Sequence, residues 1–226
     1  MNITAFLALC LIPVVAVFLI FIIAVPEMKL RYALSACVLG AITIFPATML
    51  QYFLMNLPIF LSETIISLLV TAIIFNGLVE ETFKMLFISF IPQKKITLAV
   101  FFSCAILAGI TLGSLESIIY LIKKTGQALI PFTKNDLLKL IFSRMFTSVL
   151  IHTLCAGLGG LYVWNFRHKK NSIMPFIWAV LLHGFYNFFA GFTSFFYIFS
   201  IIAILYAALE CRIWYKKSAA STLPTN

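Results

Sequence analysis

Seven long apolar stretches, separated by short polar connections, constrain the fold of this chain more than any other feature of its sequence. A helix needs roughly 20 mainly apolar residues to cross a bilayer, and each stretch is about that long or longer. Backbone groups in lipid must find hydrogen-bond partners within their own segment, which favours helices over open strands. We therefore predict an all-α fold, a polytopic transmembrane helix bundle of about seven spans. The predicted spans cover residues 3–25, 32–55, 64–91, 96–122, 137–164, 174–192 and 194–214.

The composition indicates the same class of protein. Of the 226 residues, 63% are hydrophobic and only 10% are charged, as in integral membrane proteins rather than soluble domains. The spans occupy most of the chain, so we predict a single transmembrane helical domain over residues 1–217 and a polar C-terminal tail over 218–226. The net charge of +9 comes from Lys and Arg at the span ends. This distribution indicates topology signals beside a lipid bilayer, and no nucleic-acid partner.

Lysine and arginine in the connections predict the orientation of the bundle, because cytoplasmic connections carry an excess of these residues. With the N-terminus outside and the C-terminus cytoplasmic, most of the basic residues fall on the cytoplasmic side. The outer side then receives Lys123, Lys124, Lys134 and Lys139. We therefore predict this orientation.

Two adjacent carboxylates and an ammonium lie inside the third stretch, at Glu80, Glu81 and Lys84. An ionisable group in the middle of a membrane costs roughly 2.5–3.5 kcal/mol, so three of them together indicate a functional site. Glu80 and Lys84 are four residues apart and share a helix face, which predicts an ion pair between them. Glu81 lies about 100° round the helix, so one carboxylate stays free for chemistry. The alternative is an ion pair that only joins two helices.

The fourth span carries one carboxylate, Glu116, close to a pair of glycines. Gly109 and Gly113 form a GxxxG step, which lets a neighbouring helix approach closely. We interpret the glycines as packing residues. Glu116 belongs either to the functional site or to a core ion pair with Arg144 or Lys84.

The fifth and sixth spans add two histidines. Arg144 and His152 are two steps of four residues apart, so they lie on one polar stripe of the fifth span. His183 and Asn187 are one turn apart on the sixth span. An imidazole and an amide directed at the same point can stabilise an oxyanion. For both spans the alternative is hydrogen bonding between helices without a catalytic role.

A count of helical rise compares the depths of these residues. At about 1.5 Å per residue, Glu80, His152 and His183 lie at a similar distance from their predicted cytoplasmic ends. These three side chains can therefore meet. Glu116 lies much deeper on the same count, so we expect it to miss their level.

The motifs Glu80-Glu81-x-x-Lys84, Leu112-x-x-x-Glu116 and His183-x-x-x-Asn187 resemble those of the PrsW family of intramembrane proteases, which are related to CAAX prenyl proteases and bacteriocin-processing proteins. The resemblance covers about residues 75–187. The family usually has an aromatic residue where this chain has Leu112. The resemblance implies an intramembrane endopeptidase of the inner (cytoplasmic) membrane that depends on glutamate. Its implied substrate is a membrane-spanning protein or peptide such as an anti-sigma factor, cut in a stress response.

The residues predict a mechanism for such a peptidase, in which Glu80 or Glu81 is the general base that activates water. Glu116 would orient that water. The predicted catalytic residues are Glu80, Glu81, Glu116, His152, His183 and Asn187, with Lys84 and Arg144 in support. We expect no cofactor and favour a metal-independent, glutamic-type reaction. A zinc site made of Glu and His ligands remains an alternative.

Two other functions remain open on the same residues. Buried Glu, Lys and His side chains also form proton or cation relays in membrane transporters. The chain shows no internal repeat of the kind that many transporters have. An inactive membrane scaffold of the same fold is the third possibility. Ion flux in liposomes would favour the transporter, and cleavage of a single-span protein would favour the peptidase.

Overall fold

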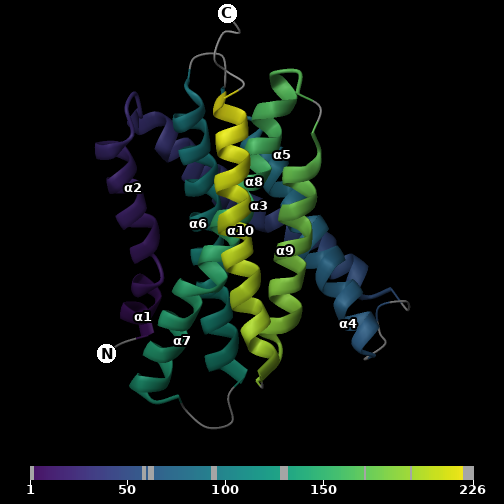
Figure 1. Ribbon diagram of the computed structural model, residues 1–226. Coiled ribbons are helices and arrows are strands. Elements are labelled where there is room, and N and C mark those ends of the chain that lie inside the picture. The colour runs from purple at the N-terminus through teal and green to yellow at the C-terminus, as the bar shows by residue number, and fades with distance from the viewer. Residues whose placement is uncertain are drawn as a thin grey trace, which may run out of the picture.

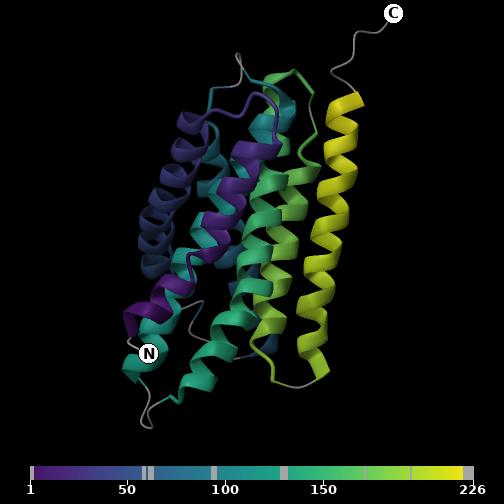
Figure 2. The same ribbon diagram turned by 90° about the vertical axis from the view of Figure 1, so that its left-hand side faces the viewer.

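A computed structural model describes residues 3–57, 60, 64–92, 96–127, 132–170, 172–193 and 195–220. Within these residues the regular elements are helices, and none is a strand. Figure 1 shows the long helices standing side by side in one bundle, with the N-terminal and C-terminal ends at opposite ends of it. In the view of Figure 2, α10 (Ile198–Ala220) stands at one edge of the bundle. The predicted all-α helix bundle is confirmed.

The other elements follow one another with short connections. They are α1 (Ile3–Leu9), α2 (Ile12–Ala24), α3 (Leu30–Met55), α4 (Ile65–Thr71), η2 (Ala72–Val79), α5 (Glu80–Ile88), α6 (Leu98–Gln127), α7 (Lys134–Phe146), α8 (Ser148–Arg167), α9 (Met174–Ala190) and η3 (Phe195–Tyr197). By length and composition, six helical segments of the described chain can cross a membrane, and α9 is a shorter apolar helix. Each predicted span therefore corresponds to a helical segment, and the orientation stays a prediction.

Three predicted spans contain a change of helix that hydropathy does not reveal. The first is divided into α1 and α2, with Pro13 in the first turn of α2. The third consists of α4, the π-helix η2 and α5. The fifth is divided at Thr147, whose φ of −126° and ψ of −77° are not helical. At the other end of the chain, Ser218 continues α10, whereas residues 221–226 of the predicted tail lie outside the described part.

The helices α6 and α8 form the centre of the bundle. In the most apolar 18-residue stretch of the span that contains each of them, 78% of the residues are buried, against 11% in the first span. Glycines allow the contact between them, because a Cβ on Gly109 would lie 2.6 Å from the carbonyl oxygen of His152, and one on Gly113 would lie 3.0 Å from Val149 Cα. The predicted role of Gly109 and Gly113 in close packing is confirmed.

A second glycine contact joins η2 to α9. A Cβ on Gly77 would lie 2.5 Å from the carbonyl oxygen of Val180. A Cβ on Gly184 would lie 2.7 Å from Ile73 Cα. The two backbones can approach this closely because neither glycine carries a side chain. This contact holds the start of α5 beside the middle of α9.

Candidate active site

The third span changes helix type where its carboxylates lie. The π-helix η2 ends at Val79, and α5 begins at Glu80. Such π-helical turns are frequent at functional sites. Glu81 is buried, with 1% of its side chain exposed, whereas Glu80 is 15% exposed and lines a cavity of about 190 Å³. The two adjacent carboxylates therefore face different surroundings.

Glu81 and Lys84 form a buried ion pair through Glu81 Oε1 and Lys84 Nζ. The same carboxylate oxygen lies 2.6 Å from His183 Nδ1 on α9. The prediction that Lys84 pairs with Glu80 is wrong. Residues three and four apart on a helix are both within reach, and Glu81 is the one buried beside Lys84 and His183, whereas Glu80 faces the cavity. Glu80 forms no ion pair with the Lys84 ammonium, so one of the two adjacent carboxylates stays free, as the spacing predicted.

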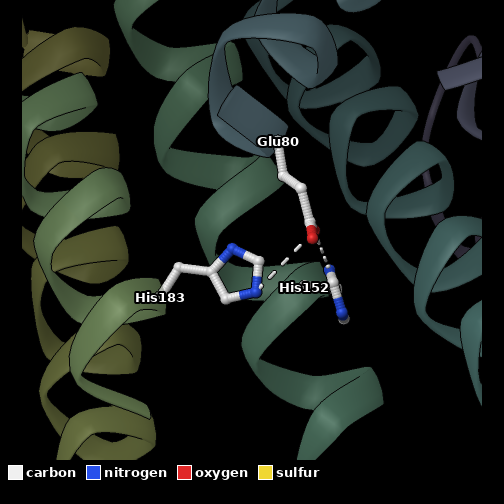
Figure 3. Close-up of side chains that lie close together, drawn as sticks. All are labelled: Glu80, His152 and His183. Carbon is white, nitrogen blue, oxygen red and sulfur yellow. Dashed lines mark ion pairs between the residues drawn. The ribbon is translucent and has the colours of Figure 1, made fainter. Parts of the chain in front are cut away.

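Glu80 points between the two intramembrane imidazoles (Figure 3). Its Oε2 lies 3.8 Å from His152 Nδ1 and 4.0 Å from His183 Nε2. The ring centroids of the histidines are 4.6 Å apart. Gln51 on α3 donates from Nε2 to Glu80 Oε1 at 2.9 Å, which fixes the carboxylate from the other side. The predicted meeting of Glu80, His152 and His183 is therefore present in the structure.

Glu116 also reaches this cluster. Its Oε2 bonds to His152 Nε2, and its Oε1 accepts a hydrogen bond from the Arg144 guanidinium at 3.1 Å. Arg144 is held in turn by Ser148 Oγ at 2.9 Å and by the ring of Tyr120, whose centroid lies 4.2 Å from the guanidinium carbon. The expectation that Glu116 misses the level of the histidines is wrong. A count of rise along upright helices ignores helix tilt and the reach of the side chains.

Asn187 is the predicted site residue that the structure does not bring to the cluster. Its Nδ2 donates to the carbonyl oxygen of His183 at 3.3 Å, within its own helix. Its side chain lines a second cavity rather than the one that Glu80 lines. The predicted convergence of the His183 imidazole and the Asn187 amide on one point is therefore absent. An amide four residues from a carbonyl on the same helix can bond to it without any outside partner.

Two amide residues were missed by sequence reasoning, which apart from Asn187 looked for site residues only among the ionisable side chains inside the spans. Gln51 bonds to Glu80 and also donates to the carbonyl oxygen of Phe75 at 3.0 Å. Asn76, four residues before Glu80, lines the same cavity as Glu80. Uncharged amides in apolar spans are the signal that would have found both. They must hydrogen-bond inside the membrane, so they too tend to face a polar interior.

The cluster also has the donors of a metal site. Glu80, His152 and His183 each offer one ligand atom, and these atoms lie within 4.8 Å of one another. The other ring nitrogen of each histidine bonds to a separate carboxylate, Glu116 for His152 and Glu81 for His183. Carboxylates in that position orient metal-binding imidazoles in many proteins. Among the described residues, His183 Nε2 is buried and has no hydrogen-bond partner, so this nitrogen is available to a metal.

A comparison with protein-family models matches residues 28–209 to the family described as PrsW family intramembrane metalloprotease. The chain belongs to the PrsW family. The match includes every residue of the carboxylate–imidazole cluster and extends from before α3 into α10. Comparisons with curated proteins and with solved structures found no match.

Membership of the PrsW family supports an intramembrane protease that acts on a protein substrate from within the membrane. The multi-pass arrangement of apolar helices agrees with that location. The family description also names a metal, whereas the sequence favoured a metal-independent reaction. The metal-independent subtype therefore stays a prediction.

Proposed function

We propose that this PrsW-family chain is a metal-dependent intramembrane peptidase whose reaction centre consists of Glu80, His152 and His183. The observation that carries the proposal is that three helical segments bring these side chains together, with their donor atoms within 4.8 Å of one another. The family match supports the peptidase reaction. The burial of these groups within apolar helices supports chemistry on a substrate in the membrane. Ionisable residues inside transmembrane segments are rare and usually functional.

The same residues would hold a divalent metal, His152 through Nδ1, His183 through Nε2 and Glu80 through a carboxylate oxygen. When bound, such a metal polarises a scissile carbonyl and makes its bound water more acidic. Glu81 and Glu116 bond to the far nitrogens of the two imidazoles. These two carboxylates therefore fix which ring nitrogen faces the centre.

We assign proton transfer to the carboxylate oxygen of Glu80 that the metal would leave free, because Glu80 is the member of the carboxylate pair that lines the cavity. It accepts the proton that the attacking water loses, and it gives that proton to the amine leaving group as the C–N bond breaks. Gln51 holds the carboxylate at the cavity wall through its hydrogen bond of 2.9 Å. Lys84 balances the charge of Glu81 and Arg144 balances that of Glu116, so two of the three carboxylates in the cluster have a cationic partner.

A metal-free, glutamic-type reaction is the second candidate, and one observation favours it. The Lys84 Nζ lies 3.2 Å from His152 Nδ1, so an ammonium already occupies one side of the centre. In this version Glu80 activates water by itself, and Lys84 supplies the positive charge that a metal would bring. The two candidates differ in their response to metal removal.

Metal content of the purified protein in nanodiscs tests the proposal directly. We expect about one divalent ion per chain in the wild type, and its loss after His152→Ala or His183→Ala. His168→Ala is the matched control, because His168 stacks on Trp164 outside the cluster, at a centroid distance of 4.3 Å. The substrates for the activity assay are membrane proteins from a strain that lacks this chain. Their cleavage by the purified protein should stop when the protein is treated with 1,10-phenanthroline and return with added zinc. Full cleavage by metal-free protein would contradict metal dependence and support the second candidate.

For the substrate, the proposal extends only to a protein that lies in the membrane. A membrane-spanning anti-sigma factor, a role in a stress response and location in an inner membrane are what the resemblance to the family implies, and all three stay predictions. Comparison of membrane fractions that contain the wild type or Glu80→Gln would identify the proteins that this chain cleaves.

A further inference from the structure

A second cavity, of about 380 Å³, lies between the start of η2 and the C-terminal end of α9. Its wall is mainly apolar and includes Leu68, Ala72, Phe188 and Phe192. An apolar cavity of about 150 Å³ is large enough to hold benzene. The volume here therefore accommodates the largest apolar side chains.

Asn76 joins this cavity to the reaction centre, because this residue lines both cavities. Glu80 follows Asn76 by four residues on the same continuous helical segment. An extended peptide advances about 3.3–3.6 Å per residue. Four residues of helix rise about 6 Å, so a peptide with its scissile carbonyl beside Glu80 can reach Asn76 and the second cavity within about two residues.

The polar groups of the second cavity suit an unwound peptide. A substrate helix must lose backbone hydrogen bonds before its peptide bond can be cut, and each unsatisfied backbone group inside the membrane is unfavourable by several kcal/mol. Asn76 and Asn187 both line this cavity. A side-chain amide can donate to a carbonyl and accept from an N–H, so these two residues offer partners to the exposed backbone.

We propose that the second cavity is the specificity pocket of the peptidase and takes one large apolar side chain, such as Phe or Leu, from an unwound substrate segment next to the scissile bond. Asn76 and Asn187 pair with the backbone of that segment. This inference rests on the proposed function, which makes the neighbouring cavity the place of cleavage. An apolar pocket discriminates between side chains of different size by about tenfold or more.

A small photoreactive probe tests the pocket without requiring cleavage. The probe is N-acetyl-phenylalanine N-methylamide with a diazirine on its ring, added to the full-length protein in nanodiscs. We expect labelling of α4 and of the end of α9, with competition by unlabelled N-acetyl-phenylalanine N-methylamide and at least tenfold weaker competition by the alanine analogue. Gly191 lines the pocket, so Gly191→Leu, which adds a large side chain at its wall, should reduce labelling at least tenfold. Gly126→Leu is the matched control, since a Cβ there meets no atom within 4 Å.

Cleavage of single-span reporter proteins that carry Phe, Leu or Ala at one position near the cut site gives the second measurement. We expect the wild type to prefer Phe or Leu over Ala by about tenfold, and Gly191→Leu to bring this ratio close to one. Absent labelling, or labelling that persists in Gly191→Leu, would overturn the proposed specificity pocket. So would a lipid acyl chain that occupies the cavity and keeps the probe out. Labelling at the pocket without cleavage of any reporter would support the binding site and contradict the proposed function.

Discussion

At the scale of single residues, the adjacent carboxylates of the third span have different contacts. Glu81 bonds to Lys84 and to His183 and is buried among them. Glu80 bonds to Gln51, faces both imidazoles and lines the cavity. We therefore assign chemistry to Glu80 and the positioning of His183 to Glu81.

Glu81→Gln should destabilise the fold, whereas Glu80→Gln should not. Removing the charge of Glu81 leaves the Lys84 ammonium buried without its ion-pair partner, and breaking a buried pair typically costs about 3–5 kcal/mol. Thermal unfolding in nanodiscs measures the difference. Glu210→Gln is the control, because within the described part of the chain the Glu210 carboxylate accepts one hydrogen bond, from Trp214. Equal destabilisation by Glu80→Gln and Glu81→Gln would contradict this division of tasks.

Arg144 bonds to Glu116, whose carboxylate in turn bonds to His152, so we expect Arg144 to position this carboxylate. Arg144→Gln should weaken zinc binding by about 10–100-fold, as loss of groups that orient metal ligands does, and Arg144→Lys should restore part of it. Competition with a zinc-binding dye measures this affinity. Arg31→Gln is a matched control, because Arg31 also lies over a tyrosine ring, that of Tyr32. Unchanged zinc affinity in Arg144→Gln would show that Arg144 has a structural role alone.

At the scale of elements, the close contact between η2 and α9 positions the centre. Gly77 and Gly184 allow it, and Glu81 and His183 bond across it. Gly184→Ala would place a methyl group 2.7 Å from Ile73 Cα, so the two elements must separate. We expect a loss of about 1–3 kcal/mol in stability and a fall in cleavage of about 10²-fold, because a shift of 1 Å misaligns reacting groups.

Gly126→Ala is the control for that substitution, since its Cβ meets no atom within 4 Å. Cleavage rate and unfolding temperature are measured for both variants in nanodiscs. If Gly184→Ala kept wild-type activity, the contact between η2 and α9 would not determine the geometry of the centre.

The sequence predicted the spans well because apolar length alone determines which segments cross a membrane. It did not predict η2 or the break at Thr147, since hydropathy is insensitive to hydrogen-bond register. It predicted that Glu80, His152 and His183 meet, because ionisable groups are rare in spans and these three lie at a similar depth. It failed for the partner of Lys84, because spacings of three and four residues are both favourable on a helix.

At the scale of the whole molecule, the start of α1 and the end of α10 lie at opposite ends of the bundle (Figure 1), as the predicted seven spans require. The distribution of Lys and Arg predicts that the C-terminal end is cytoplasmic. A fluorescent protein fused after Asn226 should therefore fluoresce, and a protease site placed between α6 and α7 should be cut from outside intact cells. Cutting from the cytoplasmic side alone would reverse the predicted orientation.

Hydrolysis in water enriched in ¹⁸O tests the central claim most directly, because a peptidase transfers an oxygen from water to each new C-terminus. Purified protein and membrane proteins from a strain that lacks it are combined in liposomes, and the products are analysed by mass spectrometry. We predict ¹⁸O-labelled C-termini from membrane-spanning segments with the wild type and with Glu210→Gln, and a loss of at least about 10²-fold with Glu80→Gln. Equal labelling with Glu80→Gln would contradict the assignment of the reaction to this centre.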